Sequence, residues 1–205
     1  MTIGVYTGPH ITLKKWDFNL LGNFARRWYG EHVYLDIVGA GADATYYVTP
    51  RLGIGASLNL LHFGFSQNSL QTGLGGNLAM SFFYTPTTAS IIRGSVAAGY
   101  QDARTSSFSN RNQQFGLSYT REFAGGVTLT LTPAYTHIAY QGPLVAFNAI
   151  RVDNQFTGQL ILLHRRLDWH GLTPRIVYTY IRNDSSVSLY TFRRSRLELG
   201  ITSAF

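Results

Sequence analysis

Apolar and polar residues alternate with a period of two along most of the chain. Between residues 74 and 84, one set of alternate positions is mainly large and apolar, and the other set is mainly Gly, Asn, Ala and Ser. The same pattern recurs at 52–60, 113–123, 127–132 and 197–205. Successive side chains of a β-strand point to opposite faces, whereas a helix repeats every ~3.6 residues. The pattern therefore predicts strands with one apolar and one polar face.

Turn-forming residues divide the chain into about eleven expected strands. The clearest turns are Thr-Pro-Arg at 49–51, Thr-Pro-Thr at 85–87 and Ala-Gly-Gly at 124–126. The expected strands span roughly residues 2–14, 17–29, 33–47, 52–65, 71–84, 89–103, 112–123, 127–140, 154–167, 172–183 and 194–205.

The connections between these strands alternate in length. The short turns fall at 14–17, 48–51, 84–88, 123–126 and 168–171, and the longer polar loops fall at about 65–71, 103–112, 141–153 and 183–194. The connection near 30–33 belongs to the second set but is short. Bacterial outer-membrane barrels have short periplasmic turns and long extracellular loops. The alternation therefore predicts that the short turns face the periplasm. It also predicts that the last strand runs inward, with Phe205 at its periplasmic end.

Composition narrows the class of protein further. Charged residues make up 13% of the chain, about half the share of a soluble domain, and aromatic residues make up 14%. The mean hydropathy is -0.02, and no run approaches the ~18 apolar residues of a membrane helix. A sheet with one lipid-facing and one polar side explains these values together. We therefore expect an all-β fold, a transmembrane antiparallel up-and-down β-barrel in the outer membrane of a Gram-negative bacterium.

The polar positions of the expected strands are small and mostly uncharged, as in a crowded barrel interior. Alternation also places five charged side chains among these lumen-facing positions. They are Asp43, Arg93, Arg175, Arg196 and Glu198. A lone charge in this environment needs a partner or water, so a salt-bridge network that braces the barrel is one interpretation. A polar conduit, or the seat of a plug, is the other.

Two features predict that this barrel lacks N-terminal strands. Bacterial single-chain barrels have an even number of strands, whereas about eleven are expected here, so either the strand boundaries include a wrong division or strands are missing. The sequence from Met1 to Trp16 has no basic start followed by an apolar stretch, so no signal peptide is visible. We expect a single barrel domain over residues 1–205 that is part of a larger barrel. Because lipid cannot satisfy unpaired strand edges, such a chain must close by another route or stay unfolded.

Several segments resemble the C-terminal barrel of the surface lipoprotein assembly modifier family. Two of them are Arg-Arg-Trp-Tyr-Gly at 26–30 and Tyr-Tyr-Val-Thr-Pro-Arg-Leu at 46–52. The resemblance is strongest at Arg-Arg-Leu-Asp-Trp-His-Gly-Leu-Thr-Pro (165–174), Tyr-Ile-Arg-Asn-Asp-Ser-Ser-Val-Ser-Leu-Tyr (180–190) and Arg-Ser-Arg-Leu-Glu-Leu-Gly-Ile-Thr-Ser-Ala-Phe (194–205). The order and spacing of these segments carry the resemblance.

The resemblance implies a fourteen-stranded barrel preceded by a periplasmic region of tetratricopeptide-like helical repeats. This chain would then hold the last strands of that barrel and lack the helical region. The implied function is a translocon that delivers lipoproteins, or secreted haem- or iron-binding proteins, to the cell surface. The expected partners are therefore outer-membrane lipid and lipopolysaccharide, a client protein and the barrel assembly machinery. A passive porin-like channel is the alternative function.

The last strand holds a candidate assembly signal. Leu199, Ile201 and the terminal Phe205 lie on one face, which resembles the signal read by the barrel assembly machinery. Three arginines precede it near the expected outer rim. Arg193, Arg194 and Arg196 either bind lipopolysaccharide phosphates or are simply solvated.

No motif predicts catalysis, a metal or a cofactor. Residues 39–44 superficially match a dinucleotide fingerprint, but no strand-to-helix context surrounds them. The six histidines lack metal-ligand spacing, and the absence of cysteine excludes a thiolate site. Ser118, Ser186 and His137 are candidates for a barrel lipase, although no spacing joins them. The net charge of +7 is dispersed without a stacking platform, so nucleic acid is not an expected partner.

Overall fold

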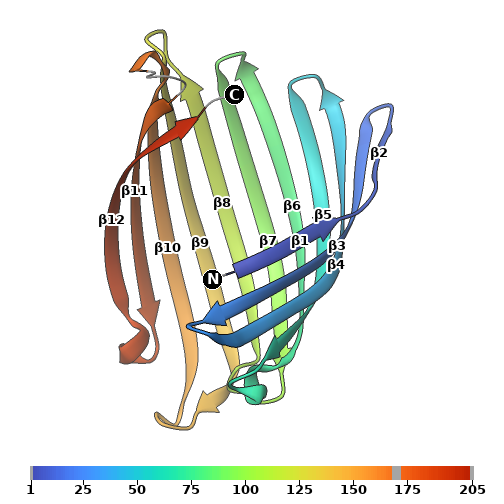
Figure 1. Ribbon diagram of the computed structural model, residues 1–205, viewed down its shortest axis with the longest axis vertical. Coiled ribbons are helices and arrows are strands. Elements are labelled where there is room, and N and C mark those ends of the chain that lie inside the picture. The colour runs from blue at the N-terminus through green and yellow to red at the C-terminus, as the bar shows by residue number, and fades with distance from the viewer. Residues whose placement is uncertain (1, 168–171, 204–205) are drawn as a thin grey trace.

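A computed structural model describes residues 2–167 and 172–203, which fold into one twelve-stranded antiparallel sheet (Figure 1). The strands are β1 (Thr2–Thr7), β2 (His10–Leu13), β3 (Trp16–Tyr29), β4 (His32–Thr49), β5 (Leu52–Phe65), β6 (Gly73–Thr87), β7 (Ser90–Ala103), β8 (Asn110–Glu122), β9 (Val127–Leu144), β10 (Ala149–His164), β11 (Leu172–Ser185) and β12 (Phe192–Ser203). Three short 3₁₀ turns are η1 (Ser69–Gln71), η2 (Arg165–Leu167) and η3 (Ser188–Tyr190). No helix among the described residues is long and apolar enough to cross a bilayer.

The sheet has an up-and-down topology. From β3 to β12 each strand pairs with the next along the chain, and β1 and β2 both pair with β3. The sheet is rolled, so β1 crosses in front of β7 in Figure 1. Among the described strands, one edge is formed by β1 and β2 and the other by β12. The expected all-β fold is confirmed, but within this chain the rolled sheet is open.

The expected first strand, 2–14, is divided at Gly8 and Pro9. β1 and β2 nevertheless pair with β3 in one continuous register, and the Pro9 carbonyl accepts a hydrogen bond from the Leu20 amide at 3.1 Å. Proline has no N–H to donate and is tolerated on an edge strand. A Cβ at Gly8 would lie 1.6 Å from the Leu20 carbonyl oxygen, so this close approach requires glycine.

The expected long loop at 141–153 is wrong, because strand pairing continues through most of it. β9 runs to Leu144 and β10 begins at Ala149, with a bulge between Ile150 and Val152. Gly-Pro at 142–143 reads as a turn in the sequence. Beyond Tyr140, however, β9 no longer pairs with β8, so the proline lies where a strand has one neighbour only.

The register divides the side chains between two faces, because directly opposed residues of an antiparallel pair share a face. One face, the apolar face, carries large side chains that stay exposed, such as Leu78 at 56% and Met80 at 62%. The other, the polar face, carries mostly Asn, Gln, Ser, Thr and Gly. A soluble sheet covers its apolar face with a second layer, and none lies over this face in the described chain. Exposed leucine and phenylalanine on a rolled sheet suit a wall that faces lipid.

Candidate functional site

Polar side chains form rows across the polar face of neighbouring strands. Asp43 lies opposite Asn19 on β3 and Ser57 on β5. The Asn19 side-chain amide donates to the Asp43 carboxylate at 2.8 Å, and the Asn19 side-chain oxygen Oδ1 lies 2.7 Å from the Nδ1 atom of His10. This chain of contacts begins at the edge strand β2 and ends on β4, so it ties that edge to the sheet.

The glycines at 39–41 lie inside β4 and belong to this crowded polar face. A Cβ at Gly41 would lie 2.3 Å from the side-chain oxygen of Asn59, and a Cβ at Gly39 would lie 2.4 Å from the carbonyl oxygen of Leu60. Both glycines make room for side chains and backbone of β5. No strand-to-helix turn is present here, so the dinucleotide motif lacks its required context.

The other predicted lumen charges lie at separate places on the polar face. Arg93 lies opposite Phe83 and Ser118, and Arg175 lies opposite Leu163 and Gly200. Neither arginine takes part in an ion pair within residues 2–167 and 172–203.

Arg196 and Glu198 lie two residues apart on β12, and their side chains form an ion pair at 2.6 Å. Their side chains remain 69% and 44% exposed, since β12 is an edge strand. The structure therefore brings together Arg196 and Glu198, but it keeps them apart from Asp43 and Arg93 on distant strands. It contains no single cluster of the five charges.

The predicted assembly signal lies along the outer edge of β12. Leu199 is 76% exposed and Ile201 is 68% exposed, and both lie on the apolar face opposite Ile176 and Pro174. Phe205 falls outside the described residues, as does the short turn at 168–171. The three arginines at 193, 194 and 196 do not form one patch, because the register places Arg193 on the face opposite to the other two.

A buried ion pair at the long-loop end of the sheet was missed from the sequence. Asp153 is 2% exposed and accepts from the Arg151 Nε atom at 2.8 Å. The Arg151 guanidinium lies over the rings of Tyr190, at 3.6 Å, and Tyr140, at 4.8 Å. Arg-x-Asp at alternate positions was the available signal, but it fell in a segment that was expected to be a loop.

The same region ties the β11–β12 loop to the end of β10. The Ser186 hydroxyl donates to the Ile150 carbonyl at 3.0 Å and accepts from the Val152 amide at 2.8 Å. The Asn183 side chain donates to the Tyr190 carbonyl at 2.7 Å. We call this set of contacts around Arg151 and Asp153 the rim clasp. The rim clasp holds the β11–β12 loop against the rim of the sheet.

The three lipase candidates are not assembled. Ser118 lies on the polar face opposite Arg93, whereas His137 lies opposite Asn154 and contacts the Asn154 side-chain oxygen through Nδ1 at 2.8 Å. Ser186 is engaged with backbone groups of β10, as above. Within the described ranges, no group of three His, Asp or Glu side chains could hold a metal ion.

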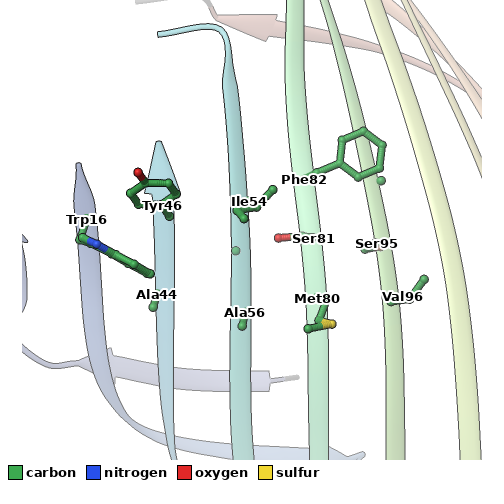
Figure 2. Close-up of a pocket in the computed structure, with 12 residues that line it drawn as sticks. Trp16, Ala44, Tyr46, Ile54, Ala56, Met80, Ser81, Phe82, Ser95 and Val96 are labelled. Carbon is green, nitrogen blue, oxygen red and sulfur yellow. The ribbon is translucent and has the colours of Figure 1, made fainter. Parts of the chain in front are cut away.

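The apolar face is hollowed next to the short turns. Figure 2 shows this outer groove, which has a volume of about 500 Å³ and crosses strands β3 to β7. The small residues Ala44 and Ala56 form its floor, and the Phe82 ring covers Gly94. Its walls are large side chains, namely Trp16, Tyr46, Ile54, Met80, Phe82 and Val96. Trp16 and Tyr46 contact each other at the end nearest the turns, with ring centroids 4.8 Å apart.

The fold and these surfaces define an integral membrane protein with a lipid-facing antiparallel wall of barrel type. Comparison with known proteins then gives the particular family. The chain belongs to the surface lipoprotein assembly modifier family, whose model matches residues 1–205. The resemblance seen in the sequence is thereby confirmed.

Relatives of this chain come from several Gram-negative bacteria. It is 21% identical over 185 residues to a surface lipoprotein assembly modifier of Pasteurella multocida, covering 85% of this chain and 36% of the relative. It is 24% identical over 151 residues to surface lipoprotein assembly modifier 2 of Haemophilus influenzae, covering 71% and 31%. The Moraxella catarrhalis relative is 23% identical over 185 residues, covering 88% and 36%. The chain thus spans about a third of the length of these curated relatives.

Family membership establishes the broad nature of the protein. It is an outer-membrane β-sheet protein of the surface lipoprotein assembly modifier family.

Proposed function

We propose that this chain is the C-terminal wall of an outer-membrane translocon that delivers client proteins to the bacterial surface. The clients would be lipoproteins, or secreted haem- or iron-binding proteins. The observation that carries the proposal is the open rolled sheet, with a polar face on one side, an apolar face on the other and an unpaired edge at β12. A polar-lined wall gives a hydrophilic client a path that avoids lipid.

The unpaired edges support completion of the barrel by further strands. Unsatisfied backbone N–H and C=O groups are too costly in hydrocarbon, so both edges must be paired in the membrane. The whole barrel would then contain strands beyond β1 to β12, with a periplasmic helical-repeat region as a further part. The barrel assembly machinery would recognise the β12 segment around Leu199 and Ile201, with Phe205, during insertion.

A surface-display assay tests the translocon. The full-length protein is co-expressed with a candidate lipoprotein in a Gram-negative host, and the lipoprotein is detected on intact cells with an antibody. We expect surface exposure with the protein and periplasmic retention without it. Equal retention in both cases, with the barrel correctly inserted, would contradict the proposal.

A porin-like channel is the second candidate function, because a polar face is all that a water-filled channel needs. Such a channel should give steady ion conductance in a planar bilayer without any client. A translocon held closed by its clients or by a plug would conduct little until a client is added. Conductance at rest combined with failed display would favour the porin.

We also propose that Asp43, Arg93, Arg175, Arg196 and Glu198 face a water-filled lumen. The chain has no cysteine, so single cysteines can be introduced without background. We expect a membrane-impermeant maleimide to label Asp43→Cys at least about ten times faster than the matched control Ala44→Cys, because adjacent strand residues point to opposite faces and a thiolate forms poorly in lipid. Mass spectrometry of protein in intact vesicles gives both rates. Equal labelling would show that the two faces do not separate water from lipid.

A further inference from the structure

We infer that the outer groove is a binding site for an anionic phospholipid of the periplasmic leaflet. One acyl chain would lie between the side chains that line the groove, and the phosphate would lie beside the basic residues of the adjoining turns. This inference concerns the lipid face of the protein and does not depend on which client, if any, the protein moves.

The shape and chemistry of the groove suit an acyl chain. Its floor is made by small residues on neighbouring strands, because Ala44 pairs with Ala56. The Phe82 ring lies over Gly94, where a Cβ would approach it to 2.2 Å, and so forms a wall beside that floor. Its walls rise on both sides through Ile54, Phe82 and Met80, which are 49%, 42% and 62% exposed. An extended apolar chain laid over the small residues would fill the hollow and make van der Waals contact with these side chains.

The turns beside the groove supply the charge complementarity. Lys14 and Lys15 form the turn just before Trp16, and the Lys15 carbonyl accepts from the Tyr47 amide at 2.9 Å, which places this turn at the end of β4. Arg51 forms the next turn, and its carbonyl accepts from the Thr85 amide at 2.8 Å, which places it between the ends of β5 and β6. Three cations therefore lie in the turns next to the end of the groove at which Trp16 and Tyr46 lie.

These cations have no carboxylate partner in the part of the chain that the structure describes. Lys14, Lys15 and Arg51 take part in none of the ion pairs of the described residues, and all three are exposed. The nearest acid in sequence, Asp17, accepts a hydrogen bond from the Tyr47 hydroxyl at 2.7 Å and lies opposite Thr45 on the polar face. Asp17 is thus held away from the groove, and the positive charge beside it remains available for a phosphate.

A second hollow on the apolar face has no comparable set of basic residues beside it. It is lined by Leu58, Leu60, Leu78 and Tyr100, but Asp102 and Arg111 both lie beside it. Because it carries one charge of each sign, it offers no net attraction to an anionic headgroup. Crosslinking at the second hollow therefore measures the contact that lipid makes with an apolar hollow irrespective of its headgroup, and it serves as the internal control.

Photo-crosslinking tests the site. The full-length protein is reconstituted in phosphatidylethanolamine vesicles that contain a small fraction of photoactivatable phosphatidylglycerol, or of phosphatidylcholine with the same photoactivatable chain. Peptide mapping then counts crosslinks in segments 44–56 and 80–96. We expect phosphatidylglycerol to exceed phosphatidylcholine there by about fivefold or more at low salt, with no such excess around Leu60 and Tyr100.

Variants separate the headgroup contact from the chain contact. The triple variant Lys14→Gln, Lys15→Gln, Arg51→Gln should bring the ratio of the two lipids close to one, whereas Arg104→Gln with Arg111→Gln at the opposite rim should leave it unchanged. Ala56→Phe should lower crosslinking by both lipids, with Ala98→Phe in the second hollow as its control. Heat-modifiable gel migration checks that each variant is folded, and Ala44→Leu replaces Ala56→Phe if that variant is not.

The outcomes are distinct from those of the surface-display assay. A lipid ratio near one in the unaltered protein, or a ratio unaffected by the triple variant, would overturn the inference and leave the groove as ordinary contact with surrounding lipid. Failed display together with selective crosslinking would contradict the translocon and leave the lipid site intact.

Discussion

Replacing Asp153 by Ala is expected to lower the free energy of unfolding by about 3 kcal/mol, which is the low end of the cost of breaking a buried ion pair. The Asp153 side chain is 3% exposed, and the Arg151 side chain is 20% exposed. Removal of the carboxylate leaves a largely buried guanidinium with only the rings of Tyr140 and Tyr190 against it. The rim clasp should therefore open before the rest of the sheet unfolds.

Hydrogen exchange of the amides in 186–191 measures this opening, and urea titration of the protein in vesicles measures global unfolding. We expect exchange in the loop to accelerate by about a hundredfold or more in Asp153→Ala, as a loss near 3 kcal/mol requires. Asp153→Asn is the matched control, because it retains an acceptor for Arg151 and nearly the same shape. Its loss should be about 1 kcal/mol. Equal effects of Ala and Asn would indicate that charge pairing contributes most of the stability, and no effect of either would show that the loop is held by other contacts.

Placing an arginine on the apolar face should have an effect of similar size. Leu78 lies in the middle of β6, is 56% exposed and has only apolar neighbours across the strands, Leu58 and Ala98. An arginine at the lipid midplane of a barrel costs about 2–4 kcal/mol. Leu78→Arg should therefore fold poorly into vesicles and shift the urea midpoint of the folded fraction downward.

The control for this prediction is the next residue. Ala79 lies on the polar face opposite Ser57 and Ala97, so Ala79→Arg should cost less than about 1 kcal/mol where water reaches that face. Vesicle folding followed by gel migration compares both variants with the unaltered protein. If Ala79→Arg were the more damaging of the two, the assignment of the lipid-facing side would be reversed.

Most of the strand positions could be predicted from the sequence, because a period of two is a local property of each segment. The strands expected at 17–29, 52–65 and 127–140 correspond to β3, β5 and β9, with boundaries that differ by few residues except at the end of β9. The errors fall where the local signal and the pairing disagree. At 141–153 the residues resemble a loop, and a bulge nevertheless keeps β9 and β10 paired.

Contacts between distant segments could not be predicted in the same way. The rim clasp joins Arg151 on β10 to Tyr190 in the β11–β12 loop, and the outer groove joins Trp16 on β3 to Val96 on β7. These contacts depend on the register of several strand pairs, and register is fixed by cross-strand packing and bulges rather than by any one segment.

The sequence by itself determined most strand positions, the alternation of the two faces and the positions of several short turns, since each depends on neighbours along the chain. Only the tertiary structure decided that the sheet rolls without closing on itself, that Asp153 is buried against Arg151 and that small residues from separate strands align into a groove. The physical reason is that burial and enclosure are properties of strands set side by side, and their relative positions are fixed only when the sheet is assembled.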